Sequence, residues 1–248
     1  RTHRRHWLAP LANGLEVLLS PDHGSQVAAV SMWYGAGSRD EPVAKAGLAR
    51  LFERLMFAGS ANVPSGGHAN IIENVGGHVT AEVDEDAARF GESLPSNWLN
   101  LGLWLEADRM RSLAINDTTV GQARLALLED LGRRVSEEPY NAAIVDGVAS
   151  LYDSTTCRGY SHPTSGRVGS IAGLTAADAQ AFFRERFTPN NARLVVTGDF
   201  DPTTAHQLIT EYFGGIPRGP DPSPATCTTN FPSGASTRTG SDRLVGGT

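Results

Sequence analysis

The chain has 248 residues, 40% of them apolar, and a formal net charge of −6. This apolar share suits a packed globular core, and the length allows one large domain or two small ones. The negative charge and the lack of a Lys/Arg-rich run argue against a nucleic-acid-binding surface. No apolar run approaches the roughly 20 residues of a membrane-spanning helix. We therefore expect a soluble protein, with the cytoplasm favoured over a secreted or periplasmic location.

Strand and helix signals are mixed along the chain. In chain order, the predicted elements are a strand at 14–19, a turn at 21–24, a strand at 27–33, a helix at 43–57, a short helix at 70–75, a strand pair at 78–90, helices at 96–112, 120–135 and 175–187, a strand at 191–197 and a helix at 201–213. The first two strands predict an opening hairpin. Thr175 is expected to be an N-cap. The mixture favours an α+β fold, with an antiparallel sheet and helices packed on one face.

Composition changes after residue 217. From 218 to 248 the chain is rich in Pro, Gly, Ser and Thr, which is typical of a linker or flexible tail. We therefore expect one domain over 1–217 and a linker or tail over 218–248. Cys157 and Cys227 show no spacing typical of metal binding, and two unpaired thiols are favoured over a disulfide.

The helix predicted at 43–57 carries the most informative segment. Residues 47–59 read Gly-Leu-Ala-Arg-Leu-Phe-Glu-Arg-Leu-Met-Phe-Ala-Gly. With His at positions 50 and 54 the segment would contain His-x-x-Glu-His, in which two imidazoles hold zinc and the Glu activates a metal-bound water. Both positions are Arg, and a guanidinium stays protonated without a lone pair for a metal. The spacing of a zinc site is present without its ligands.

This segment resembles the pitrilysin/insulysin family of inverzincin metallopeptidases, and within it the bacterial branch that is similar to mitochondrial processing peptidase. The likeness runs in the family's order from residue 11 to about 217. The blocks that carry it are Asn13-Gly-Leu15, Tyr34-Gly-Ala-Gly-Ser-Arg-Asp-Glu41, Met56-Phe-Ala-Gly-Ser60, Leu94-Pro-Ser-Asn97, Leu103-Trp-Leu-Glu-Ala-Asp-Arg-Met110, Phe187-Thr-Pro-Asn-Asn191 and Val195-Val-Thr-Gly-Asp-Phe200. Members usually have two such domains, so the resemblance implies an amino-terminal half.

The resemblance also locates the third metal ligand, a Glu on a later helix of the family. The matching residue is Asp130, whose side chain is one methylene shorter. Glu53 keeps the position of the water-activating base, but without a metal-bound water it has little to activate. We therefore expect no metal or other cofactor in this chain, and a non-functional Glu53. Zinc is expected in a partner chain instead.

The side chains of Arg50, Glu53 and Arg54 are interpreted as an ordinary polar helix face. Arg50 and Glu53 are three residues apart and can form an ion pair. The alternative is a recognition role, in which Arg50 or Arg54 holds an acidic group of a partner. Either interpretation excludes zinc hydrolysis by this half.

The resemblance places a substrate-binding edge strand after Gly76-Gly77, where relatives bind an extended peptide as an added strand. The matching residues are Thr80 and Ala81, followed by Glu82, and Phe90 stands where many relatives have Tyr. Thr in place of Asn removes an amide that could bond to a peptide backbone. The acidic residues of 82–86 are interpreted as a solvated turn, with attraction of a basic peptide as the alternative.

Three histidines and two serines are the remaining candidates for metal binding or nucleophilic catalysis. His68 and His78 are expected near the cleft, and His162 lies in a loop that resembles a family loop. A replacement metal site of His78 with Glu53 or Asp130 is a minor alternative. Ser96 and Ser161 have no identifiable triad partners.

The resemblance implies a non-catalytic subunit of a heteromeric zinc peptidase that processes or degrades peptides. Such a subunit completes the enclosed chamber and helps to bind extended substrate for a homologous zinc-bearing partner, in a heterodimer. Alone, it is expected to be inactive. The alternative is a purely structural subunit of a larger complex without proteolysis.

Overall fold

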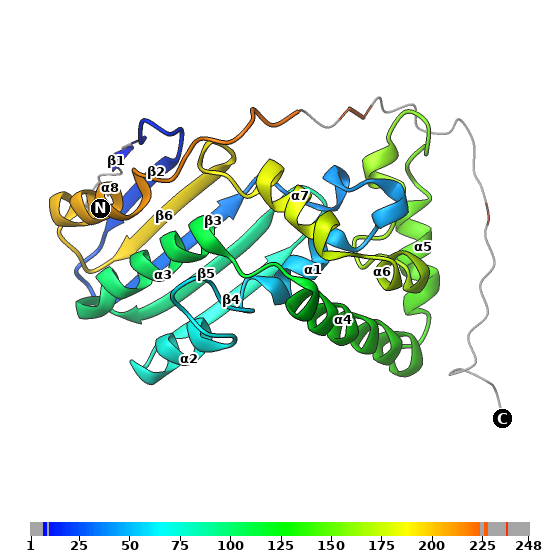
Figure 1. Cartoon of the computed structure of the whole chain (residues 1–248), viewed down its shortest axis with the longest axis horizontal. Helices are drawn as coiled ribbons and strands as arrows, with labels where there is room; N and C mark the ends of the chain where they lie inside the picture. The colour runs from blue at the N-terminus through cyan, green and yellow to red at the C-terminus, as the bar shows by residue number, and fades with distance from the viewer. Residues whose placement is uncertain (1–6, 9, 224–225, 228–236, 238–248) are drawn as a thin grey trace.

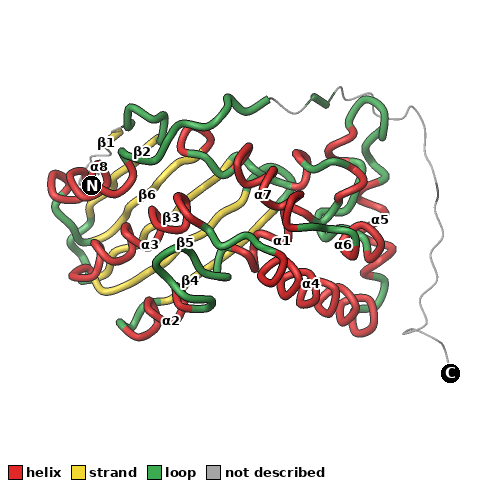
Figure 2. The backbone as a smooth tube through the Cα atoms, viewed as in Figure 1, coloured by secondary structure: helices red, strands yellow, loops and turns green. Residues whose placement is uncertain are grey.

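The computed structural model describes residues 7–8, 10–223, 226–227 and 237. Its centre is a six-stranded sheet in the order β1-β2-β6-β3-β5-β4, with helices against one face (Figure 1). The strands are β1 (Trp7–Leu8), β2 (Glu16–Pro21), β3 (Val27–Tyr34), β4 (His78–Val83), β5 (Ala88–Pro95) and β6 (Ala192–Gly198). The helices are α1 (Leu48–Leu55), α2 (Gly67–Asn74), α3 (Leu99–Ser112), α4 (Asp117–Glu137), α5 (Asn141–Ala149), α6 (Val168–Ala172), α7 (Ala176–Arg186) and α8 (Pro202–Phe213). In Figure 2, α4, α5 and α6 group beside the sheet rather than over it.

The predicted opening hairpin is wrong, because β6 lies between β2 and β3. It pairs in parallel with β2 and antiparallel with β3. The turn after β2 reverses the chain without pairing the two strands that it joins. An inserted β6 has both of its edges hydrogen-bonded and buries Leu194 and Val196 completely. The sheet is therefore mixed rather than antiparallel throughout, while the α+β class with helices on one face is confirmed.

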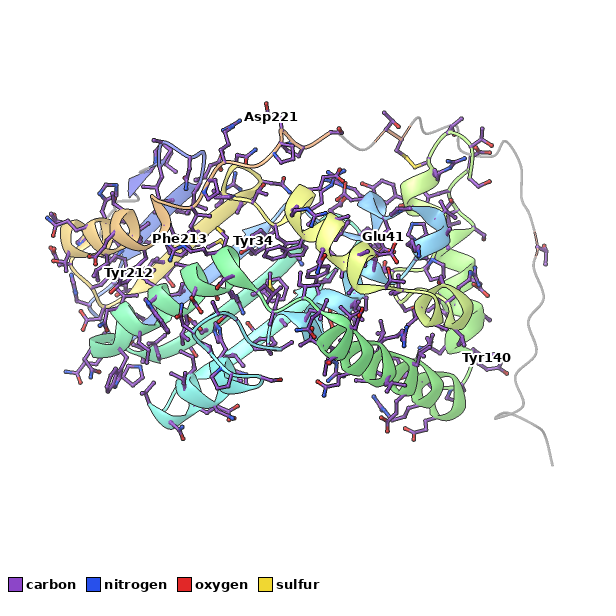
Figure 3. The ribbon with its side chains drawn as sticks, in the orientation of Figure 1. Tyr34, Glu41, Tyr140, Tyr212, Phe213 and Asp221 are labelled. Atoms are coloured by element: carbon purple, nitrogen blue, oxygen red, sulfur yellow. A yellow bond between two sulfur atoms is a disulfide. The ribbon has the colours of Figure 1, made fainter. Side chains whose placement is uncertain are left out.

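Aromatic side chains join the sheet to the helices. Tyr34 of β3 and Phe187, at the end of α7, have ring centroids 4.9 Å apart, and Phe187 stacks on Phe52 of α1 at 4.4 Å. Phe90 of β5 lies edge-on to Tyr34 at 6.2 Å. All four side chains are almost completely buried, and Figure 3 marks Tyr34 near the middle of the molecule. Contacts of this kind fix the position of α1 relative to the strands.

The start of α1 is displaced from its predicted place. The helix expected from Val43 begins only at Leu48, because Gly47 has a φ of 100°, a conformation that suits glycine. The buried Glu41 (Figure 3) then caps the helix: its carboxylate accepts the N–H groups of Gly47 at 2.6 Å and Ala49 at 2.9 Å. These bonds satisfy donors that have no partner within the helix.

The other predicted helices are present with shifted ends. Thr175 caps α7, since its side chain accepts the N–H of Asp178, as predicted. Two helices, α5 and α6, are missing from the prediction. They have nine and five residues, and α5 contains Gly147, so neither gives a long helical pattern. Among the described residues, no helix is both long enough and apolar enough to span a bilayer.

After α8, residues 214–223 form a strap that lies along the domain. Asn13 donates to two carbonyls at the end of α8 and just beyond it, each at 2.9 Å. Asn190 accepts the N–H of Gly219 at 2.8 Å and donates to the C=O of Pro220 at 2.9 Å. This first part of the predicted linker is therefore hydrogen-bonded to the domain. Most of 224–248 lies outside the described residues.

A disulfide joins Cys157 to Cys227, so the prediction of two unpaired thiols is wrong. Sequence spacing could not reveal the bond, because it depends on the path of the strap from α8 toward the loop after α5. Cys157 itself is buried. The bond ties the segment that follows the domain to the helical part that contains α5.

We expect the disulfide to stabilise the whole domain. It closes a loop with a sequence separation of 70 residues, for which chain-entropy arguments give about 4 kcal/mol. The double variant Cys157→Ser/Cys227→Ser should unfold at lower urea concentration than the oxidised wild type. A dithiol reductant should destabilise the wild type and leave the double variant unchanged. Equal stability of all four samples would contradict this prediction.

Candidate functional site

The motif side chains lie on the partly exposed side of α1. Arg50 donates to Glu53 Oε1 at 2.6 Å, so the predicted ion pair is confirmed. The Arg50 and Glu53 side chains are 23% and 18% exposed, whereas Arg54 is an exposed residue. Partial burial reduces screening by water, so this pair is stronger than a fully exposed helical pair.

Glu53 also reaches the edge strand β4. Its Oε1 accepts the N–H of Val83 at 2.9 Å, and Arg50 Nη1 lies 3.5 Å from the carbonyl oxygen of Val83. Burial raises the pKa of Glu53, while the Arg50 charge and the Val83 bond oppose the rise. The residue at the former base position therefore holds α1 against β4.

Asp130 lies on α4, which packs against α1. Its carboxylate accepts from Arg133 at 2.7 Å and from Arg134 at 3.1 Å. The hydrogen bond from Arg133 and the two guanidinium charges lower the pKa of Asp130. Arg134 also lowers the pKa of Glu53 through its charge, so it connects the two acidic positions. The sequence analysis missed Arg134, although its place four residues after Asp130 is a recognisable ion-pair spacing.

These residues do not fit a zinc ion. Two of the three ligand positions are guanidinium groups, which cannot coordinate a metal. The third, Asp130, is already bound by two arginines, and Glu53 is bound by Arg50 and Val83. The positive charge beside Glu53 and Asp130 comes from arginine side chains.

The strand beside the motif, β4, is at the edge of the sheet. Thr80, Ala81 and Glu82 are exposed or partly exposed on it. Thr80 donates its hydroxyl to Gly91 at 3.3 Å, and Glu82 pairs with Arg89 at 3.4 Å. The predicted substrate-strand positions are therefore together on an accessible edge.

Phe90, the fourth predicted position, is on the buried face of β5. Its ring contacts Tyr34 and lies under the guanidinium of Arg109, at 5.0 Å. A buried position among core side chains explains why the residue there is aromatic. Phe90 is placed for packing and not for contact with a ligand.

A cavity of ≈ 600 Å³ opens between the β4–β5 turn and α4 and α5. Arg50, Asp130 and Arg134 line one part of it, and the turn residues 84–86 line another. A third part of its wall is apolar, from Leu127, Leu131, Ile144, Val145, Val148, Ala149 and Tyr152, and residues 83, 160 and 162–165 complete the lining. Ile144 and Val148 are 62% and 51% exposed, so α5 presents unburied apolar surface to this cavity.

The acidic turn is not free to bind a basic ligand by charge alone. Asp84 pairs with Arg89 at 2.6 Å, and Asp86 is bound by Arg39. Glu85 accepts a hydrogen bond from the Thr164 hydroxyl at 2.7 Å. Each of the three carboxylates therefore has a partner within the fold, so ion pairs and a hydrogen bond hold this turn in addition to water.

His68 lies away from the motif in a buried polar group. Its Nε2 is 2.9 Å from Glu92 Oε2, and Glu106 nearby is bound through both oxygens by Arg109. Potential ligand atoms of His68, Glu92 and Glu106 lie within 4.8 Å, and no other such group with three or more members occurs among the described residues. Because Arg109 occupies Glu106 and adds a positive charge, we interpret the group as a hydrogen-bonded core network.

The remaining candidates form no catalytic arrangement in the described part of the chain. His78, at the start of β4, belongs to no group of potential metal ligands with Glu53 or Asp130. Ser96 and His23 both bond to Asp199, which therefore stands between them, whereas a triad needs the His in the middle. His162 lines the cavity, and burial lowers the pKa of its imidazole.

Comparisons with known proteins identify the family of this chain. Residues 16–162 match the family described as Insulinase (Peptidase family M16), and residues 173–242 match the Peptidase M16 inactive domain. The chain belongs to peptidase family M16. This confirms the resemblance to the insulysin and pitrilysin peptidases.

Two similar proteins are a subunit of a processing peptidase and a bacterial zinc protease. Mitochondrial-processing peptidase subunit beta of Blastocladiella emersonii is 26% identical over 84% of this chain and 44% of its own length. Zinc protease PqqE of Helicobacter pylori is 25% identical over 86% of this chain and 47% of its own. The chain thus spans slightly less than half the length of these relatives.

Solved M16 structures have the same fold. A protease from Helicobacter pylori superposes with a TM-score of 0.81 and 25% identity, over 89% of this chain and 52% of that one. Pitrilysin superposes with a TM-score of 0.79 and 18% identity, over 92% of this chain and 25% of its own.

The His68–Glu92 pair leads to a pH prediction. Burial lowers the pKa of His68 to about 2 and raises the pKa of Glu92 well above 4.5, so the folded pair is neutral. Between about pH 4.5 and 6.5 the pair holds one proton in both states: on Glu92 in the folded protein and on His68 in the unfolded chain. The pair then adds no pH slope to the free energy of unfolding.

Each single variant should reveal one of the two pH dependences of the free energy of unfolding, from Glu92 or from His68, that cancel in the wild type. In His68→Gln, the folded Glu92 holds a proton that the unfolded chain loses, because burial raises its pKa. The free energy of unfolding should therefore fall relative to wild type as pH rises above about 4.5. In Glu92→Gln the free energy should instead fall as pH drops below about 6.5. Urea unfolding at several pH values measures both slopes. His78→Gln is the control, and equal slopes for all variants would refute the neutral pair.

Proposed function

We propose that this chain is the non-catalytic subunit of a heteromeric zinc peptidase. The observation that carries the proposal is the M16 fold in which Arg50, Arg54 and the arginine-bound Asp130 stand at the positions expected for metal ligands. Such a subunit contributes surface for peptide binding while a homologous partner holds the zinc and cleaves the peptide bond.

Peptide binding by this subunit would use the edge of β4 and the adjoining cavity. An unpaired strand edge offers backbone N–H and C=O groups to an extended peptide, and neighbouring pockets select its side chains. The apolar wall formed by α5 suits large apolar side chains, because their burial there removes Ile144 and Val148 from water.

The Cys157–Cys227 disulfide bears on the compartment. Disulfides persist in oxidising environments and are rare in the cytosol of most organisms. In place of the cytoplasmic location expected from the sequence, we propose that the protein works in an oxidising compartment.

The first test concerns the metal. The purified chain should contain no stoichiometric zinc at the motif, because no ligand set is available there. The triple variant Arg50→His/Arg54→His/Asp130→Glu should bind about one zinc ion more than its parent in metal analysis, since it restores three ligands on α1 and α4. The double variant Arg50→His/Arg54→His should bind more weakly. Equal zinc content of the parent and the triple variant would show that the scaffold no longer holds the ligand geometry.

The second test concerns the partner. Affinity purification of the full-length protein from its native source should recover an M16 chain with an intact His-x-x-Glu-His motif. Peptide cleavage should require both chains and should be lost when the partner's motif Glu is changed to Gln. Co-purification with no effect of this chain on cleavage would favour the structural-scaffold alternative. Zinc-dependent cleavage by this chain alone would refute the proposal.

A further inference from the structure

Backbone groups of β4 point alternately toward β5 and away from it. The N–H of Asp84 donates to the C=O of Ala87 at 3.0 Å, so the residue before Asp84, Val83, belongs to a pair that is not hydrogen-bonded across the hairpin. By the same alternation, Ala81 and Val79 also direct their N–H and C=O groups outward. No described residue hydrogen-bonds to the outward backbone groups of Ala81 or Val79.

Val83 differs from Ala81 and Val79 because α1 already occupies its outward groups. Glu53 accepts its N–H at 2.9 Å, and Arg50 lies against its carbonyl oxygen. A peptide strand that reached Val83 would have to displace Glu53 from this bond. Displacement would leave a partly buried carboxylate with one hydrogen bond fewer, which is unfavourable.

We propose that the Arg50–Glu53 pair is an end stop for a peptide added to β4: pairing runs along Val79 and Ala81 and ends before Val83. This inference depends on the proposed peptide-binding function and specifies the length and register of the bound segment. At about 3.3 Å per residue, the open stretch of the edge pairs with about three or four peptide residues.

The end stop also fixes where the peptide leaves the sheet. Arg50 and Val83 both line the cavity, so a peptide that departs before Val83 continues into it, toward the apolar wall of α5. Arg50 and Glu53 act here as positioning residues: they touch the strand that holds the peptide and set its limit. The positions of a ligand and a base in the zinc motif thus have a new use in peptide binding.

The test compares peptides of different length on the whole chain. Fluorescein-labelled, capped peptides of alternating Val and Ser are compared at lengths of about four and about six residues. For the wild type, whose open stretch pairs with about four residues, the longer peptide should bind no more tightly than the shorter one. In Arg50→Ala/Glu53→Ala, the longer peptide should bind about tenfold more tightly than the shorter one, because the N–H and C=O of Val83 become available for two backbone hydrogen bonds.

Two further variants control for indirect effects. Glu53→Gln keeps an oxygen that can accept the Val83 N–H, so the longer peptide should gain little affinity over the shorter one in this variant, as in the wild type. Arg54→Ala, on the same helix but exposed, should behave as wild type. Amide hydrogen exchange at Val83 without peptide gives a separate measurement: the amide should be protected in wild type and exchange at least about tenfold faster in Glu53→Ala.

The outcomes separate the end stop from the function on which it depends. Length dependence that is unchanged in Arg50→Ala/Glu53→Ala, or a wild-type Val83 amide that exchanges freely, overturns the end stop while peptide binding stands. Failure of every peptide to bind a correctly folded wild type overturns peptide binding by this subunit, and the end stop with it.

Discussion

The central position of β6 determines the rest of this structure. By pairing with both β2 and β3, it hydrogen-bonds the interior of the sheet, and β1 covers the outer edge of β2. β4 is left as the long strand with one unpaired edge. β6 also joins α7, whose end supplies Phe187 to the core, to α8, from which the strap departs. The accessible strand and the bound strap both follow from this one pairing.

The altered metal site keeps its electrostatic balance without a metal. In a zinc site, two acidic side chains would lie near a divalent cation. Here Glu53 and Asp130 instead accept hydrogen bonds from Arg50, Arg133 and Arg134. Guanidinium groups supply positive charge together with directed hydrogen bonds. Each of the two carboxylates therefore has a cationic partner, and α1 packs against α4.

The Arg50–Glu53 pair also connects α1 to the neighbouring strand. It bonds to Val83 at the inner end of β4. Because the cavity, the strand edge and the motif meet at this point, small changes on α1 are expected to alter peptide binding more than stability. The disulfide adds a second constraint on the same region, since it ties the strap to the loop that follows α5.

The sequence by itself determined the family and the main helices, and it predicted that residues 50 and 54 cannot bind zinc. Those conclusions follow from local properties: periodic apolar residues, an N-cap at Thr175, and guanidinium groups that cannot bind metal. Tertiary structure alone decided that β2 pairs with β6, that Cys157 meets Cys227, and that Glu53 bonds to Val83. Each of these contacts joins residues that are distant in the sequence or lie on different elements, so no local pattern encodes it. Their formation depends on how the whole chain packs.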